Sequence, residues 1–247
     1  MNSLFTGLAL TAALLATAGG AGAAAAAKPQ TTSVVVTDAD RAEFRKAIAG
    51  NEMFVLLMKE FPAQYAAFET QLLADDKAGA LTAASARDRI STFIAGIQRD
   101  TLPFSRKASD ADITMLYARN LEVVKTLQRF NYRACYQFAG GSGLAPEVSD
   151  SLPQDAIQPL GAYAVFELKV AIVGRKTNVP HKPLAAEEFG PIIQAFVARG
   201  GDVKYLTVSG GQAGDMTPEE RCRNAILWKE TIVAQPPAMV GRIANTD

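Results

Sequence analysis

The longest periodic pattern in the chain covers residues 109–138, which read SDADITMLYARNLEVVKTLQRFNYRACYQF. At 100° per residue, one stripe of this segment is apolar. It consists of Ile113, Leu116, Tyr117, Leu121, Val124, Leu127, Cys135 and Phe138, and the opposite face carries Glu122, Lys125, Arg129 and Arg133. A Ser-Asp-Ala-Asp start favours an N-terminal cap, and Gly140-Gly141 favours a stop. The pattern predicts one long amphipathic helix that buries a single face.

Similar helical patterns recur through the rest of the chain, and few segments alternate with the period of a strand. Helices are predicted over 37–49, 52–61, 82–103, 154–174, 185–199 and 217–235, and in a segment that starts at Pro62. Residues 203–208 are predicted to form a short extended piece. The fold class expected for residues 37–247 is therefore an all-α, single-domain bundle of about seven helices with irregular loops.

Two polar residues interrupt the apolar stripe of 109–138. Asn120 and Asn131 project close to its centre, and eleven residues of straight helix would separate them by about 16 Å. A buried Asn needs hydrogen-bond partners. We therefore expect these two side chains either to link neighbouring helices or to line a polar pocket between them.

The start of the chain has the character of an export signal. Residues 1–27 contain no charged side chain, an apolar run covers 4–15, and small residues follow it. These features predict a signal peptide that is cleaved between residues 18 and 28, followed by an extended lead-in over 28–36. No later run has the length and apolar composition that would predict a transmembrane anchor in the mature chain. The mature chain is expected to be soluble and either periplasmic or secreted.

The two cysteines, Cys135 and Cys222, predict one disulfide between two helices, because an exported protein folds in an oxidising compartment. Two free buried thiols are the alternative. The chain has a single histidine, His181, in a Pro-containing loop where an exposed position is expected. Two cysteines and one histidine without close spacing do not form a typical zinc site, so no metal is predicted.

Charge and motifs narrow the function classes. Lys plus Arg equals Asp plus Glu, at 25 each, so the basic excess of a nucleic-acid binder is missing. The commonest hydrolase and phosphate-loop motifs do not occur, and no cofactor is predicted. We expect a non-catalytic binding or envelope-interaction protein, whose partner is an envelope protein or a small ligand. The alternative is a periplasmic hydrolase with paired carboxylates, drawn from Glu60, Glu69, Glu167 and Glu188.

One short segment resembles a known family. Residues 216–221, Met-Thr-Pro-Glu-Glu-Arg, are similar to the Leu-Thr-x-x-Gln segment of small periplasmic helical chaperones of the Spy type. The resemblance covers six residues and departs at two, with Met in place of Leu and Glu in place of Gln. It implies, as a minor alternative, a helical chaperone.

Overall fold

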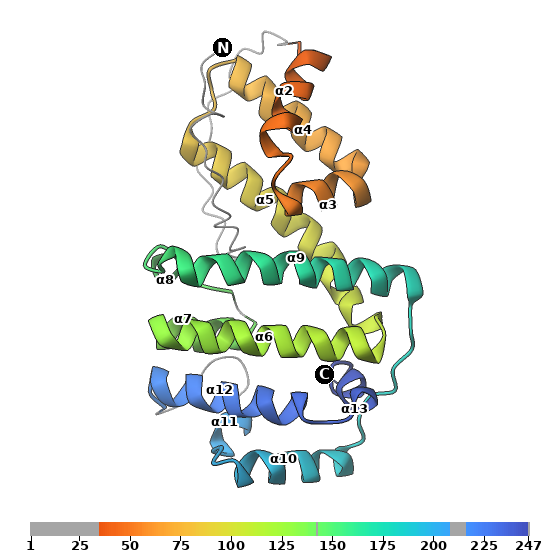
Figure 1. Ribbon diagram of the computed structural model, residues 1–247, viewed down its shortest axis with the longest axis vertical. Coiled ribbons are helices and arrows are strands. Elements are labelled where there is room, and N and C mark those ends of the chain that lie inside the picture. Colours follow the sequence, from red (N-terminus) through yellow and green to blue (C-terminus); the bar gives the residue numbers. More distant parts are fainter. Residues whose placement is uncertain (1–34, 142, 208–215, 247) are drawn as a thin grey trace. The chain divides into compact units, whose positions relative to one another are not determined.

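The computed structural model describes residues 35–141, 143–207 and 216–246 (Figure 1). In these ranges the regular structure is entirely helical, which confirms the predicted all-α class. The chain divides into two compact units, with the boundary between Gly96 and Ile97. We call the described residues 35–96 unit 1 and the described residues 97–246 unit 2. The predicted signal peptide and most of the lead-in lie outside the described residues.

Unit 1 is built from helices with well-defined starts: α2 (Asp38–Ile48), α3 (Glu52–Glu60), α4 (Pro62–Lys77) and α5 (Ala83–Thr101) up to Gly96. Thr37 and Asp40 form the predicted capping box of α2, and the side chain of Asn51 accepts two backbone N–H groups at the start of α3. The core of unit 1 is apolar and includes Phe44, Phe54, Leu57, Tyr65, Leu72 and Ile94, each at most 3% exposed.

One carboxylate is completely buried in unit 1. Glu69 on α4 is 0% exposed and accepts hydrogen bonds from Arg45 at 2.7 and 2.8 Å and from Arg41 at 3.0 Å. Both arginines lie on α2, one helical turn apart. A buried charge is tolerated only when it is paired and hydrogen-bonded, so this cluster joins α2 to α4.

Unit 2 contains the end of α5 and ten further elements. They are η1 (Leu102–Lys107), α6 (Asp110–Phe130), α7 (Tyr132–Ala139), α8 (Pro146–Ser149), α9 (Gln154–Thr177), η2 (Ala186–Glu188), α10 (Phe189–Ala198), α11 (Lys204–Thr207), α12 (Pro218–Val233) and α13 (Pro237–Ile243). Figure 1 shows α9, α6 and α12 side by side, with α6 in the middle. The core of unit 2 therefore forms around α6.

The apolar stripe of α6 faces this core as predicted, and Ile113, Val124 and Leu127 are at most 1% exposed. The prediction of one continuous helix over 109–138 is wrong. Asn131 has an extended backbone, and its side chain accepts hydrogen bonds from the N–H groups of Arg133 and Ala134 at 2.8 and 3.1 Å. Asparagine is a strong helix N-cap, so it ends α6 and begins α7 at Tyr132.

The predicted number of about seven helices is too low, because the described residues contain twelve α-helices and two 3₁₀ helices. Most of the difference comes from one- and two-turn helices in segments expected to be loops. The extended piece predicted at 203–208 is also wrong in its described part. The side chain of Asp202 accepts the N–H of Lys204 at 2.9 Å, and this cap begins the single turn α11.

Two glycines allow close helix packing in unit 2. A Cβ on Gly174 of α9 would lie 1.9 Å from the carbonyl oxygen of Phe104 in η1, so α9 packs directly on the η1 backbone. A Cβ on Gly241 of α13 would lie 2.1 Å from Oδ1 of Asp110 at the start of α6. A larger residue at position 174 would force α9 away from the η1 backbone, and one at position 241 would displace the Asp110 side chain.

The expectation of an exposed His181 is wrong, because its side chain is 5% exposed. Its Nε2 lies 2.8 Å from the carbonyl oxygen of Ala108, and its Nδ1 lies 3.2 Å from Oδ1 of Asp110. These contacts hold the loop before η2 against the start of α6, so His181 has a structural position.

By length and composition, α9 is a helix that could cross a membrane. The sequence reading missed it because Glu167 and Lys169 interrupt the run. Long core helices pass the same test, and 44% of its most apolar window is buried inside the structure. Its packing against α6 and η1 is that of a core helix.

Candidate functional site

A pocket of about 880 Å³ lies within unit 2. Its wall is formed by several elements: the end of α5, the segments η1 and 139–141, the helices α6, α9 and α12, and the C-terminal residues. Its apolar surface comes from residues such as Leu102, Ile113, Leu116 and Ile243. A volume of several hundred Å³ with apolar walls and a few convergent polar groups is typical of a small-molecule site.

The polar groups of the pocket come from helices that are far apart in sequence. Tyr163 and Glu167 lie on α9, four residues apart, so they share one face of that helix. Asn120 is on α6 and Lys229 is on α12. Because α6 packs against both α9 and α12, the fold brings these four side chains to one cavity.

Tyr163 is the centre of a small hydrogen-bonded group. Its hydroxyl donates to Oε1 of Glu167 at 3.2 Å, and the Asn120 side chain forms a hydrogen bond with Tyr163 that favours the phenolate. Burial, followed by the charge of Glu167, raises the pKa of Tyr163 well above its ordinary value. Tyr163 therefore remains a phenol, and its hydroxyl donates a hydrogen bond to the Glu167 carboxyl group.

Glu167 and Lys229 have pKa values that move toward each other. Burial raises the pKa of Glu167, and the Tyr163 hydrogen bond and the charge of Lys229 oppose that rise. Burial lowers the pKa of Lys229 to about 8, and the charge of Glu167 opposes that fall. Each group is therefore easier to neutralise than in water, which is the property of an acid–base pair at a functional site.

The two groups influence each other without forming a direct pair. No ion pair within 4.0 Å joins Glu167 to Lys229, and Lys229 has no hydrogen bond or ion pair to any described residue. The neighbouring Lys125 differs, because its Nζ lies 2.9 Å from Oε1 of Glu230. Lys229 is thus a partly buried residue of the pocket wall, and its amine has no hydrogen bond or ion pair to a described residue.

Positive charge predominates in the described wall of the pocket. The wall contains Arg99, Arg106 and Lys229 but one carboxylate, Glu167, although Arg99 is largely exposed and also pairs with Asp100 at 3.2 Å. Arg106 is close enough to Tyr117 to lower its pKa, although burial dominates and raises that pKa overall. A cleft lined by an excess of one charge attracts a ligand of the opposite charge.

The two asparagines named from the sequence have different places. Asn120 lines the pocket, and its Oδ1 is buried without a hydrogen-bond partner. Asn131 is the N-cap of α7 and is absent from the described pocket wall. The break at Asn131 also removes the straight helix from which their separation was calculated.

The predicted disulfide is confirmed. Cys135 on α7 and Cys222 on α12 are bonded, with their Cα atoms 5.5 Å apart and both side chains 0% exposed. The bond lies outside the described pocket wall, but it joins two helices that lead to that wall. The end of α7 continues into the pocket residues Ala139–Gly141, and α12 carries Lys229.

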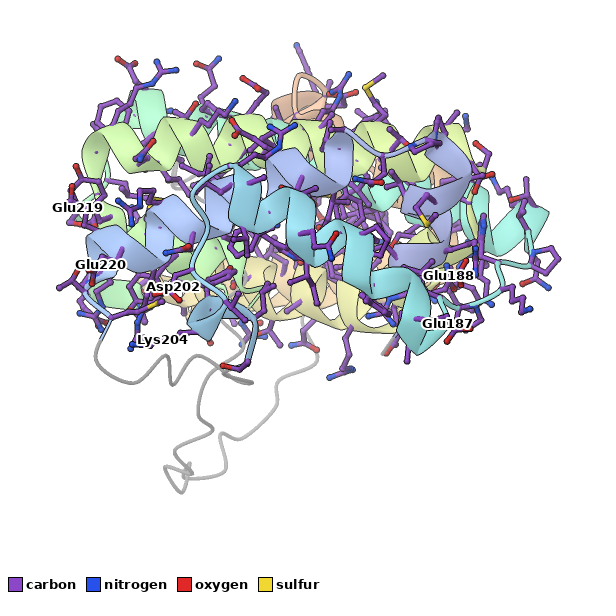
Figure 2. The ribbon with its side chains drawn as sticks, turned by 90° about the horizontal axis from the view of Figure 1, so that it is seen from below. Glu187, Glu188, Asp202, Lys204, Glu219 and Glu220 are labelled. Atoms are coloured by element: carbon purple, nitrogen blue, oxygen red, sulfur yellow. A yellow bond between two sulfur atoms is a disulfide. The ribbon has the colours of Figure 1, made fainter. Side chains whose placement is uncertain are left out.

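The carboxylates considered for a hydrolase do not gather in one place. Glu60 and Glu69 lie in unit 1, and the Glu69 carboxylate accepts hydrogen bonds from two arginines. In unit 2, Glu188 accepts hydrogen bonds from Arg242, with Nη1 at 2.6 Å from Oε1. Figure 2 shows Glu188 at one end of α10, away from Glu219 and Glu220 at the start of α12. Of the four candidates, only Glu167 lines the pocket.

Metal binding has no support in the described part of the chain, which holds no cluster of three or more His, Cys, Asp or Glu side chains suited to an ion. The residues of the pocket that sequence reasoning missed are Tyr163 and Lys229. Glu167 was named only for its apolar neighbours. A polar pair four residues apart within the apolar helix 154–177 was the available signal, and nothing in the sequence connects that pair to α12.

An all-helical protein with a positively charged, partly apolar pocket in its unit 2 is the class that the fold and site define. Comparisons with protein-family models, curated proteins and solved structures find no match to this chain.

Proposed function

We propose that this chain is an exported helical protein whose unit 2 binds a small ligand that carries an acidic group. The observation that carries the proposal is the Lys229 amine, which lines the pocket without a partner among the described residues. A buried or half-buried amine without a partner is unfavourable, and an anionic ligand would supply the missing interaction.

Two further features support this ligand class. Arg99 and Arg106 add positive charge to the same wall, and the apolar side chains provide contact area for the rest of a small molecule. The disulfide is consistent with an oxidising compartment, as expected for an exported protein.

The other function classes have less support. A paired-carboxylate hydrolase requires two acidic groups in one cleft, and the described wall of this pocket holds one. The chaperone resemblance rests on residues that begin α12, where Thr217 and Glu220 form a capping box. That local role accounts for the same residues without a shared function.

Binding is tested by thermal shift of the full chain against a panel of small carboxylates and phosphates at pH 7. A ligand at a hundred times its Kd stabilises the folded state by about 2.7 kcal/mol. We expect hits with wild type and with Lys125→Met, and their loss with Lys229→Met. Lys125 is the matched control because it lies outside the described pocket wall and pairs with Glu230. Hits that survive Lys229→Met would contradict the proposal.

A further inference from the structure

The pocket places an amine opposite a carboxyl group without pairing the two. We propose that Lys229 is a nucleophile that captures the carbonyl group of a small aldehyde or ketone acid as an imine, with Glu167 as the proton donor. This inference deepens the proposed function, on which it rests for the acidic part of the ligand. The imine itself is a separate claim about one atom, Nζ of Lys229.

The positions of Lys229 and Glu167 in the pocket support this inference. Lys229 of α12 and Glu167 of α9 both line the cavity and interact electrostatically, yet more than 4.0 Å separates the amine from the carboxylate oxygens. A direct ion pair would block the amine, as Glu230 occupies Lys125 at 2.9 Å. Because both residues line the same pocket, a ligand in that pocket can contact both of them.

A hydrogen bond from Tyr163 holds the Glu167 side chain in place. Tyr163 donates a hydrogen bond to its Oε1 at 3.2 Å, and both residues lie on the same face of α9. This bond fixes one carboxyl oxygen and leaves Oε2 as the atom that can exchange a proton with a ligand. A positioned acid within reach of the reacting oxygen is what carbonyl addition requires.

The reaction balances with these groups alone. The neutral amine of Lys229 attacks the carbonyl carbon, a C–N bond forms, and the C=O π electrons move to oxygen. That oxygen takes the proton of the Glu167 carboxyl, and an amine proton moves to the same oxygen. The C–O bond then breaks and water leaves. The products are a protonated imine, water and the Glu167 carboxylate, which stabilises the new positive charge.

The protonation states support this direction. The reactive form of lysine is the neutral amine, and burial lowers the pKa of Lys229 to about 8. Burial likewise raises the pKa of Glu167, so its carboxylate takes up a proton more readily than that of an exposed glutamate and can pass it to a ligand. Desolvated lysines with lowered pKa values are the ones that form Schiff bases in proteins.

The positive wall explains why the carbonyl compound should also be an acid. Arg99 and Arg106 border the same cavity as Lys229. In a small oxo acid the carboxylate lies close to the carbonyl, so one ligand can bring its negative charge to this basic wall and its carbonyl to the Lys229 amine. Glyoxylate, a small aldehyde acid, is a suitable probe of this arrangement.

The test is reductive trapping. The full chain is incubated with glyoxylate and sodium cyanoborohydride at pH 7, digested, and mapped by peptide mass spectrometry. We expect N-alkylation of Lys229 to be roughly tenfold or more faster than that of Lys125, because Lys125 is held in an ion pair with Glu230 and the lowered pKa of Lys229 leaves more of its amine neutral. The preference should disappear when the chain is unfolded in urea.

Two variants separate the parts of the proposal. Lys229→Arg keeps the positive charge, so it should retain glyoxylate binding by calorimetry while losing the adduct at this position. Glu167→Gln removes the proton donor and also a charge that raises the lysine pKa, so a purely electrostatic role predicts faster trapping. We expect several-fold slower trapping instead, and circular dichroism verifies that both variants are folded.

The outcomes are distinguishable. Selective trapping at Lys229 that slows in Glu167→Gln supports the inference. Glyoxylate binding by wild type without an adduct at Lys229 overturns the imine and leaves the proposed function standing. If neither glyoxylate nor any carboxylate or phosphate of the panel binds, and no adduct forms at Lys229, both proposals are overturned. Equal labelling of Lys229 and Lys125 overturns the nucleophile assignment.

Discussion

Removal of the Cys135–Cys222 bond should destabilise unit 2 strongly. The bond closes a loop with a sequence separation of 87 residues, for which the chain-entropy model gives about 4.6 kcal/mol at 25 °C. Measured values are usually smaller, and we expect about 2–4 kcal/mol for the Cys135→Ala, Cys222→Ala double variant. For a unit of this size, a loss of 3 kcal/mol lowers Tm by about 6–12 °C.

The assay follows unit 2 specifically. Trp228 is the one tryptophan of the chain, it lies on α12, and its ring packs edge-on against Phe196 with centroids 5.6 Å apart. Its fluorescence therefore reports the unfolding of unit 2 in urea. The control is wild type measured with the disulfide reduced, which should match the double variant. A loss below about 0.5 kcal/mol would refute the reasoning, because it would mean that the bond hardly constrains the unfolded chain.

Three further substitutions test the packing. Arg45→Met removes two of the three hydrogen bonds to buried Glu69 and should cost about 2–3 kcal/mol by urea unfolding in far-UV circular dichroism, with Arg45→Lys losing less; an unchanged midpoint would contradict the buried pair. Asn131→Ala removes the cap of α7 and should cost about 1 kcal/mol by tryptophan fluorescence, whereas Asn131→Asp should be tolerated; equal losses would argue against capping. Gly241→Ala should cost about 1–3 kcal/mol, since its Cβ would lie 2.1 Å from Asp110, and a neutral effect would mean that α13 packs more loosely than described.

Local features of the fold were predictable from the sequence because their causes are local. The capping boxes at Thr37 and Thr217 each depend on residues three apart, and both are present. The inward stripe of α6 follows from the helical period. The disulfide followed from an even cysteine count and the expected compartment, and Cys135 lies on the buried side of α7.

The break at Asn131 shows where periodicity alone fails. The apolar pattern continues across the break, so the period gives no warning of it. The chemistry of the residue did provide a signal, because asparagine competes for backbone N–H groups and favours helix starts over helix interiors. The short helices α8 and α11 were missed because single turns are too short to show a period.

The pocket could not be predicted because it depends on tertiary packing. Glu167 and Lys229 belong to α9 and α12, which border one pocket because each of them packs against α6. In the sequence each looks like an ordinary charge on a helix surface. Their candidate role follows from their burial and their proximity in the fold, and sequence spacing does not predict either property for residues so far apart in the chain.

The pKa of Lys229 is the measurement that tests the account most directly. Lysine side-chain NMR of the full chain would follow its titration, with the paired Lys125 as the internal reference. Burial opposes the charged form, so the amine should lose its proton earlier than an exposed lysine, with a pKa of about 8. Glu167→Gln should lower that value further. A pKa near 10.4, the ordinary value for lysine, would contradict the account, since it would place the Lys229 amine in water rather than in the pocket.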